Sequence, residues 1–282
     1  MTKLVALHPQ QGEVNTYFQA ESRYWNDVYT IPGVQAEIIR DRHAAVLDWI
    51  DGLALAPGSR VLEIGCGAGF MAVSLAHRGF RVHAVDSVES MVDIARTNAA
   101  KAGIADMVSF SVGDVYSLLF NDSFFDLVLA IGVIPWLDQS ELAMQEMARV
   151  AKPKGYVIVS TANRSGLASL LDPLISPLFQ LFKLSVKSIL VKLGLRRRTP
   201  HMVFHSNRYI EKTLEGIALV KVKAMTRGFG FSFFRGSVLP EPLGTKVNRR
   251  LQQLADRNIP VLRSTGMAYF ILTKKLDPGR KY

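Results

Sequence analysis

A ten-residue segment near the middle of the first half constrains this chain more than any other. Residues 61–70 read VLEIGCGAGF: an apolar run, one acid, three glycines at alternate positions and an apolar continuation. The apolar run predicts a buried strand, and the continuation predicts the start of a helix. Glycine has no Cβ atom, so a turn with three glycines lets the backbone come close to a bound ligand. The segment therefore predicts a strand–turn–helix unit with a ligand at the turn.

A second strand is predicted at residues 82–86, and it ends in Asp86. In Rossmann-like folds a carboxylate at this position accepts hydrogen bonds from the hydroxyls of a ribose. The dinucleotide fingerprint would need a third glycine at position 70, where this chain has Phe70. The glycines at 65, 67 and 69 therefore disfavour a nicotinamide or flavin dinucleotide. The sequence also has no Gly-Lys-Ser/Thr phosphate-binding loop.

Five segments in order carry a resemblance to a known family. Residues 63–69 resemble motif I of the class I S-adenosylmethionine-dependent methyltransferases, and residues 86–91, 112–115, 125–136 and 150–159 resemble the segments that follow it. The last segment departs from the family's Leu-Lys-Pro-Gly-Gly turn at its first and fourth positions, which hold Ala151 and Lys154. The resemblance implies an α/β, Rossmann-like, doubly wound fold. Its sheet is expected to be mostly parallel and seven-stranded, with helical lid insertions.

The same resemblance implies S-adenosylmethionine as cofactor and assigns its site. Asp86 would bind the ribose hydroxyls, Met91 would pack on the adenine, and Asp114 would accept from the adenine amino group. Loop 131–136 would flank the methionine part and the methyl acceptor. The predicted cofactor-binding residues are Tyr24, Glu63, Gly65, Cys66, Gly67, Gly69, Asp86, Ser87, Met91, Gly113, Asp114, Val115, Ile131 and Gly132.

The composition narrows the expected location and partners of the chain. The single cysteine, Cys66, excludes a disulfide within the chain, so we expect a reducing, cytoplasmic location. No second cysteine or His-Cys spacing suggests a zinc site, so we expect no metal. We find no signal-peptide pattern and no apolar run of the ~20 residues that a membrane span needs. The net charge of +10 favours anionic surroundings, such as lipid head groups, nucleic acid or an acidic substrate.

We expect one domain over residues 1–282. Its predicted parts are an N-terminal helical cap (1–56), a cofactor-binding half (57–161), an apolar and basic insertion (162–205) and a C-terminal half (206–282). Strand and helix patterns alternate between residues 60 and 161, as a parallel sheet with crossover helices requires. The C-terminal half is expected to begin with a helix whose N-cap is Ser206. It is also expected to carry a long insertion, with a helix near 246–255, between the sixth and seventh strands, predicted at 218–225 and 267–274.

The most apolar region is residues 166–198. It is rich in leucine, carries Lys183, Lys187 and Lys192, and ends in three arginines at 196–198. A strongly apolar, basic helix can lie in a membrane interface, where its lysines reach toward the head groups. The alternatives are a lid over the active site or a contact in a homodimer. The sequence leaves these alternatives open, and with them a peripheral membrane location.

Methyl transfer from a sulfonium is an in-line displacement, so positioning matters most. A general base helps an oxygen nucleophile but is not always needed. The candidate bases are His201, His205 and Tyr209, with purely structural roles as the alternative. The candidate substrate-binding residues are Tyr17, Trp136, Phe229 and Phe231; core packing is the alternative for Tyr17 and for the two phenylalanines.

The resemblance is strongest to small-molecule methyltransferases of ubiquinone, menaquinone and natural-product pathways. It implies a small, apolar or lipid-linked acceptor and most readily O-methylation. A short N-terminal likeness to magnesium-protoporphyrin methyltransferases adds a tetrapyrrole carboxylate as a minor candidate. The alternative function is an RNA methyltransferase that uses the basic surface. Residues 134–136 read IPW, where DNA amino-methyltransferases carry Asn/Asp-Pro-Pro-aromatic, and no RNA-binding module is visible, which disfavours nucleic acid.

Overall fold

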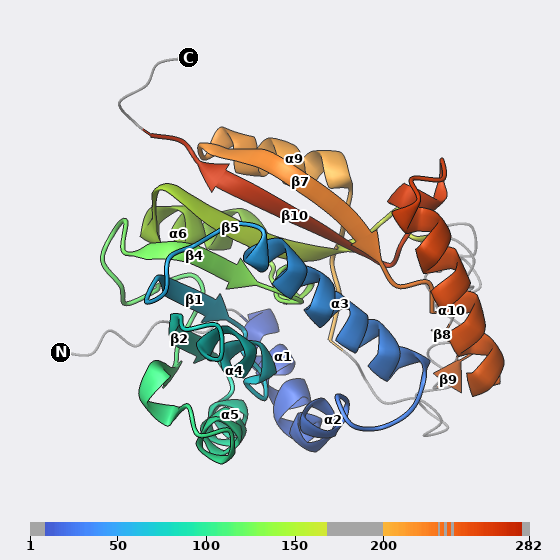
Figure 1. Ribbon diagram of the computed structural model, residues 1–282, viewed down its shortest axis with the longest axis horizontal. Helices are drawn as coiled ribbons and strands as arrows, with labels where there is room; N and C mark the ends of the chain where they lie inside the picture. Colours follow the sequence, from blue (N-terminus) through green and yellow to red (C-terminus); the bar gives the residue numbers. More distant parts are fainter. Residues whose placement is uncertain (1–8, 168–199, 231, 234–235, 238–239, 278–282) are drawn as a thin grey trace.

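The structure is a computed structural model that describes residues 9–167, 200–230, 232–233, 236–237 and 240–277. A central sheet organises these residues (Figure 1). Five strands run parallel in the order β3-β2-β1-β4-β5. Their bounds are β1 (Arg60–Ile64), β2 (Arg81–Asp86), β3 (Val108–Val112), β4 (Phe125–Ala130) and β5 (Ala151–Asn163).

The sheet is completed by β10 (Ala268–Lys275), which lies antiparallel between β5 and β7 (Leu219–Arg227). The predicted Rossmann-like, mostly parallel sheet is confirmed. The strands predicted at 218–225 and 267–274 are β7 and β10, displaced by one or two residues. A further strand of two residues, β6 (Phe204–His205), pairs with the end of β5. It was not predicted, because two residues are too short for a periodic pattern.

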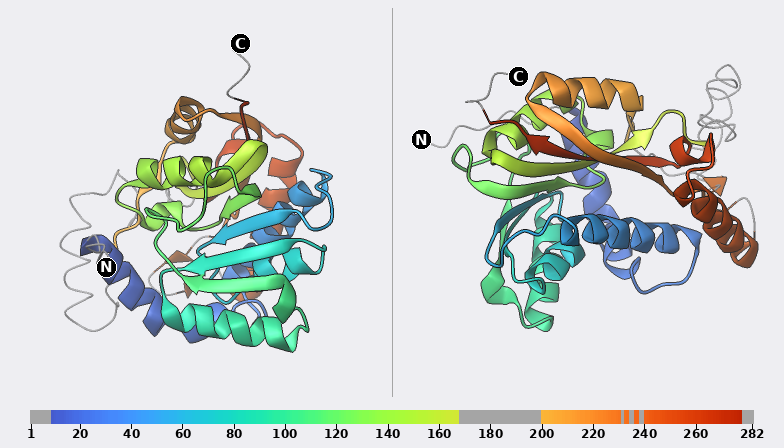
Figure 2. Two further views of the ribbon diagram at one scale, coloured as in Figure 1. Left: turned by 90° about the vertical axis from the view of Figure 1, so that its left-hand side faces the viewer. Right: turned by 45° about the horizontal axis from the view of Figure 1, so that its top comes forward.

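Apolar side chains on both faces of the sheet explain the double winding. Alternate residues of one strand point to opposite faces, so Val61 packs with α3 (Val34–Asp51), α4 (Phe70–Ala76) and α5 (Glu89–Lys101). Its neighbour Leu62 packs with α6 (Ser140–Val150) and α9 (Asn207–Gly216) on the other face. Figure 2 shows α3 and α9 on opposite sides of β7 and β10. Both helix layers therefore bury the sheet.

Two helices precede this core, α1 (Pro9–Ala20) and α2 (Ser22–Asp27). Polar side chains of α1 dock on Ser87, the residue directly after β2. The Ser87 hydroxyl donates to Asn15 Oδ1 at 2.8 Å, and Gln11 Nε2 donates to the same oxygen at 2.8 Å. Parallel strands end at one edge of the sheet, so α1 lies over the edge where ligands bind in open α/β sheets.

The connection between β7 and β10 contains α10 (Glu241–Asp256) and a hairpin of β8 (Ser232–Phe233) with β9 (Gly236–Ser237). A helix was predicted here at 246–255; it starts earlier because Pro242 suits a first helical turn. Two buried amides of α10 hold the chain after β7. Asn248 Oδ1 accepts from the Phe229 amide at 2.9 Å, and Gln252 Oε1 accepts from the Gly228 amide at 3.0 Å.

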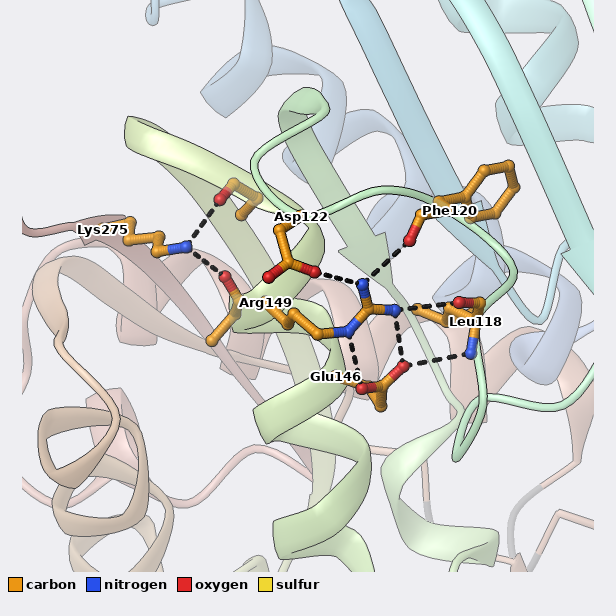
Figure 3. A network of polar contacts seen from close by, with 8 residues as sticks. Leu118, Phe120, Asp122, Glu146, Arg149 and Lys275 are labelled. Atoms are coloured by element: carbon orange, nitrogen blue, oxygen red, sulfur yellow. Dashed lines mark hydrogen bonds and ion pairs between the residues drawn. The ribbon is translucent and has the colours of Figure 1, made fainter.

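Arg149, near the end of α6, fixes the loop between β3 and β4 (Figure 3). Its guanidinium donates to the carbonyls of Leu118 and Phe120 at 2.9 and 2.8 Å, and it pairs with Glu146 and Asp122 at 2.8 and 2.6 Å. The Glu146 carboxylate also accepts from the Leu118 amide. One side chain thereby satisfies two carbonyls that no strand or helix uses.

Short 3₁₀ turns complete the chain: η1 (Ala105–Met107), η2 (Ile134–Trp136) and η4 (Leu262–Ser264). Of the apolar, basic insertion predicted at 166–198, residues 168–198 lie outside the described residues. Among the helices that the structure describes, none is long and apolar enough to cross a membrane. The same residues contain no cluster of three or more His, Cys, Asp or Glu side chains suited to a metal ion.

Candidate functional site

A cavity of about 460 Å³ lies at the carboxyl ends of β1, β2 and β4. Its walls come from the glycine-rich turn, from the residues after β2 and β4, and from α1, α2 and α3. The volume is within the range usual for small-molecule sites, ~300–1,000 Å³. The site therefore lies where the strand–turn–helix pattern predicted a ligand.

The glycine-rich turn needs glycine for two different reasons. Gly65 has φ +68°, and a Cβ there would lie 2.4 Å from the Val133 Cγ2 atom, so the turn packs directly on the loop after β4. Gly69 has φ +81° and begins α4; a Cβ there would lie 2.8 Å from the Ala95 Cβ of α5. Gly67 lines the cavity, and a Cβ there would meet nothing within 4 Å. Of these three glycines, Gly67 is the one whose added Cβ would enter open space beside the cavity.

Asp86 anchors the turn as well as the cavity. Its Oδ2 atom accepts from the Gly67 amide at 2.9 Å, and its Oδ1 atom accepts from the Val88 amide at 2.9 Å. Burial raises the pKa of the Asp86 carboxyl, and these amide bonds oppose the rise. The carboxylate therefore already braces the Gly67 backbone while it lines the cavity.

Glu63 is a buried acid with an unsatisfied oxygen. Its side chain lines the cavity, and its Oε2 atom has no hydrogen-bond partner among the described residues. Burial raises the pKa of the Glu63 carboxyl to about 8, and the nearby Asp86 charge adds to the rise. A buried polar atom without a partner is costly, so this oxygen is suited to a ligand that donates a hydrogen bond.

Arg42 of α3 brings a positive charge to the same cavity. Its Nε atom is buried without a hydrogen-bond partner among the described residues, and the side chain lines the cavity. Burial lowers the pKa of Arg42 to about 10, with the neighbouring Asp41 charge opposing it, so the group stays charged near pH 7. Glu63 and Arg42 together can receive a ligand that carries both an ammonium and a carboxylate.

Aromatic rings form another wall. The Trp136 ring stacks on Tyr17 at 6.1 Å between centroids and meets Phe18 edge-on at 5.3 Å. Phe18 in turn contacts Trp25 of α2 at 5.7 Å. Residues from α1, α2 and η2 thereby build one aromatic surface, and all four rings line the cavity. This wall suits an apolar or planar acceptor.

Tyr29 and His43 form a polar chain beside the aromatic wall. The Ser74 hydroxyl donates to the Phe70 carbonyl at 2.9 Å, so its oxygen accepts from His43 Nε2 at 3.0 Å. This leaves His43 Nδ1 facing the Tyr29 hydroxyl at 3.5 Å. Burial lowers the pKa of His43 to about 4, with Arg78 adding to the effect, so the imidazole is neutral at pH 7.

The cavity collects most of the residues predicted for the cofactor. Those that line it are Tyr24, Glu63, Gly65, Cys66, Gly67, Asp86, Ser87, Met91, Ile131 and Gly132. Gly69, Gly113, Asp114 and Val115 do not. The Asp114 Oδ1 atom accepts from the Tyr116 amide at 3.0 Å, Gly113 packs on Val85, and Val115 is buried in the core.

Of the predicted substrate residues, Tyr17 and Trp136 line the cavity. Phe229 is buried with 1 % of its surface exposed and does not line the cavity. Phe231 lies outside the described residues. The Phe-rich segment therefore contributes to the core at Phe229, which is the alternative that the sequence left open.

None of the three candidate bases lines the cavity. The rings of His205 and Tyr209 stack at 5.0 Å between centroids, and the Tyr209 hydroxyl donates to Glu141 Oε1 at 2.7 Å. Burial lowers the pKa of His205 and raises the pKa of Tyr209. His201 is exposed, and its carbonyl accepts from Gln10 Nε2 at 3.2 Å. Their role as bases stays a prediction.

Several cavity residues were missed by the sequence analysis, among them Phe18, Tyr29, Arg42 and His43. Arg42 and His43 lie inside an ordinary amphipathic helix, where a charged side chain usually faces solvent. Only the packing of α3 beside α4, where His43 bonds to Ser74, directs them toward the cavity. The aromatic-rich stretch at residues 17–29 did carry a signal, since five aromatic residues in so short a stretch suggest a buried wall.

Comparisons with known proteins agree with this geometry. Residues 62–159 match the family model described as Methyltransferase domain. The ubiquinone biosynthesis O-methyltransferase of Paracidovorax citrulli is 34 % identical over 125 residues, which is 44 % of this chain and 52 % of that protein. Its counterpart in Azoarcus sp. is 27 % identical over 154 residues, which is 55 % of this chain and 64 % of that protein. The matched part thus spans about half to two thirds of these relatives.

Solved structures share the fold over nearly the whole chain. Magnesium protoporphyrin IX methyltransferase from Synechocystis PCC 6803, with bound SAH, superposes with a TM-score of 0.64 at 16 % identity, covering 94 % of this chain and 99 % of that one. The [4+2]-cyclase SpnF superposes with a TM-score of 0.60 at 16 % identity, covering 95 % and 96 %. Because one of these is named a cyclase, the shared fold does not fix the reaction.

Proposed function

We propose that this chain, which belongs by fold and domain match to the class I S-adenosylmethionine-dependent methyltransferases, methylates a small apolar or lipid-linked acceptor, most readily on oxygen. The observation that carries the proposal is the cavity itself. One side holds a buried acid and a buried guanidinium, and another side is built of aromatic rings. A zwitterionic cofactor and an apolar acceptor need these two environments next to each other.

The residues present fit the cofactor. The unsatisfied Glu63 oxygen suits the ammonium of its methionine part. Arg42, whose buried Nε atom has no partner among the described residues, suits the carboxylate. Asp86 lines the cavity at the end of β2, where it would receive the ribose hydroxyls, and Met91 would pack on the adenine. S-adenosylmethionine supplies a methyl group already activated by the positive charge on sulfur.

The chain's own contribution is to orient the acceptor and keep out water. Tyr17, Trp136 and Phe18 would hold an apolar acceptor against the cofactor side of the cavity. A hydroxyl acceptor loses its proton during transfer, and no described residue is assigned as the base. His43 is neutral and lies in the cavity wall. Its Nδ1 atom faces the Tyr29 hydroxyl and can accept a hydrogen bond there.

Ubiquinone biosynthesis O-methyltransferases among the relatives favour O-methylation of a small molecule, and the Mg-protoporphyrin enzyme among the structural neighbours keeps a carboxylate acceptor open. An RNA substrate is not favoured, because no feature of the cavity or of the comparisons supports it. Membrane contact through 166–198, a homodimer and a cytoplasmic location stay predictions. Light scattering on the purified chain measures the oligomeric state.

The test follows a labelled methyl group. The protein is incubated with methyl-labelled S-adenosylmethionine and a cell extract, which is then separated into lipid-extractable, water-soluble and nucleic-acid fractions. We expect label in the organic phase, and none when Asp86 is replaced by alanine. Label in the water-soluble fraction would contradict a lipid-linked acceptor, and label in nucleic acid would contradict the whole proposal.

A further inference from the structure

We propose that the carboxyl end of α10 and the turn after it dock on a membrane surface that contains anionic phospholipid. We call this surface the basic tip; it consists of Arg250, Arg257, Ile259, Pro260, Val261 and Arg263. The inference does not depend on the proposed methyl transfer. It concerns a surface outside the cavity and residues other than the insertion at 166–198.

Helix α10 has two faces of opposite character. Its buried face carries Gly244, Asn248, Gln252 and Ala255, and the two amides bind the backbone after β7. Residues four, seven and eleven positions apart lie on one side of a helix, so Lys246, Arg250, Gln253 and Arg257 form a stripe. All four are exposed. The stripe carries three cations and no acid, and it leads to the tip.

The arginines of the basic tip differ from their neighbours in their ion pairing with the described residues. Nearby, Arg249 pairs with Glu37 at 2.6 Å, and Arg227 pairs with Asp256 at 3.1 Å. These pairs engage Glu37 and Asp256, two of the acids near α10. Arg250, Arg257 and Arg263 form no ion pair with a described residue, and residues 257–264 contain no acid. Their charge is therefore available for phosphate groups outside the chain.

Two aliphatic side chains project at the tip. Ile259 is 41 % exposed and Val261 is 68 % exposed, on either side of Pro260. Val261 adopts φ +71° and ψ −58°, and the Leu262 amide donates to the Pro260 carbonyl at 2.9 Å, which defines a γ-turn. This backbone is strained for a β-branched residue. The fold thus holds an apolar side chain outward between arginines, the arrangement that a charged lipid interface accommodates.

The basic tip lies at the same edge of the sheet as the cavity. The Ser264 carbonyl accepts from Asn163 Nδ2 at 2.8 Å, and Asn163 is the last residue of β5. Strands β1 and β4, whose ends border the cavity, run parallel to β5 and finish at that edge. Figure 1 shows α10 at the end of the molecule toward which β1 and β4 point. Docking would therefore bring the cavity edge near the lipid.

The first test measures co-sedimentation of the full chain with vesicles of phosphatidylcholine and phosphatidylglycerol, and with vesicles of phosphatidylcholine alone. We expect binding to the anionic vesicles only, weakened by salt. Combining Arg250→Gln, Arg257→Gln and Arg263→Gln should weaken it by at least about tenfold, since each cation near an anionic surface contributes about fivefold. The matched control, Arg81→Gln with Lys101→Gln and Lys212→Gln, removes the same charge from exposed sites elsewhere and should change binding by less than about twofold.

The second test separates the apolar contact from the charge. Val261→Gly relieves the positive φ, so the thermal midpoint should stay unchanged or rise while vesicle affinity falls. A fluorophore on Val261→Cys should shift its emission to the blue on vesicles, whereas one on Leu119→Cys should not. Leu119 is 94 % exposed and lies outside the tip, and the native Cys66 is buried.

Three results would overturn the proposal. The first is vesicle binding that the arginine variant and its control reduce equally, which would place the contact elsewhere, for example at 166–198. The second is the absence of binding to anionic vesicles. The third is that the native chain binds single-stranded RNA but not vesicles, and that the arginine variant loses this RNA binding. That result would make the tip a nucleic-acid surface. The vesicles hold no cofactor or acceptor, so a failure here leaves the proposed methyl transfer untouched.

Discussion

Two carboxyl groups of the cavity, Glu63 and Asp86, sit in different environments. Asp86 accepts two backbone amides, whereas the Glu63 Oε2 atom accepts nothing among the described residues. The burial that raises the pKa of Glu63 to about 8 keeps this carboxyl neutral at pH 7 in the free protein. A bound ammonium favours the ionised form. Cofactor binding at neutral pH is therefore coupled to a proton.

We predict that S-adenosylmethionine binding at pH 7 releases a proton from Glu63. The dissociation constant should fall as pH rises toward 8, by up to about tenfold per pH unit, and then level off. Calorimetry in buffers of different ionisation enthalpy measures the released proton. Glu63→Gln should remove both effects. The same proton release in that variant would assign it to another group.

The raised pKa of Glu63 also affects folding. The unfolded carboxyl ionises near its usual value of 4.5, while the folded one stays protonated up to about pH 8. The unfolded state therefore loses protons first, so the free protein should lose stability as pH rises from 4.5 to 8. Urea titrations at several pH values measure this loss, which Glu63→Gln should reduce. An unchanged slope with pH in that variant would contradict the assignment.

The glycines of the turn allow a matched pair of substitutions. Gly67→Ala places its Cβ in open space, so it should cost only about 1–2 kcal/mol of unfolding free energy for the positive φ, yet weaken cofactor binding strongly. Gly69→Ala meets the Ala95 Cβ at 2.8 Å and should cost about 1–3 kcal/mol more, with a smaller effect on affinity. Denaturant titration and calorimetry measure the two quantities. Equal affinity losses would contradict the separate roles.

At the scale of elements, single side chains hold long connections in place. Arg149→Ala leaves the carbonyls of Leu118 and Phe120 without this donor and Glu146 without its ion-pair partner, so it should lower the unfolding free energy by about 2 kcal/mol. Amide exchange in loop 114–124 should become faster. Asp93→Ala, which removes an exposed pair with Arg96 and no bond to a carbonyl, is the control and should cost about 0.5 kcal/mol or less. Equal losses in both variants would contradict the anchoring role.

At the scale of the whole molecule, ligand binding should stabilise the fold. S-adenosylmethionine at about a hundredfold excess over its dissociation constant adds about 2.7 kcal/mol. For a chain of this size that raises the thermal midpoint by about 5–10 °C. Differential scanning fluorimetry measures the shift, and Asp86→Ala at the same concentration should show less. No shift in the native chain would contradict the cofactor assignment.

The sequence predicted the sheet well because the strands are buried on both faces and so contain continuous apolar runs, as in residues 127–130. It also predicted Ser206 as a helix N-cap, and the Ser206 hydroxyl oxygen accepts from the Tyr209 amide. Signals of this kind, which depend on neighbouring residues in the sequence, agree with the folded structure. The start of α10 was placed too late, because its first turn consists of residues without helical periodicity.

The sequence predicted the site residues only where they lie close to a motif along the chain. Residues next to the glycine-rich turn, such as Glu63 and Asp86, follow from the motif. Arg42 and His43 reach the cavity through the packing of α3, which no spacing along the chain reveals. Conversely, proximity in sequence to the insertion placed His205 and Tyr209 among the candidates, while the fold stacks them on each other outside the cavity wall.

The single cysteine has a practical consequence. Cys66 lines the cavity from within the glycine-rich turn, and burial raises its pKa well above the usual value. The thiolate, which is the reactive form, is therefore scarce near neutral pH. Since the chain has no other thiol, the rate at which iodoacetamide alkylates it reports on this cavity alone. The protein thus carries a built-in chemical reporter: any molecule that fills the cavity should slow the reaction, so unknown acceptors can be screened before a turnover assay exists.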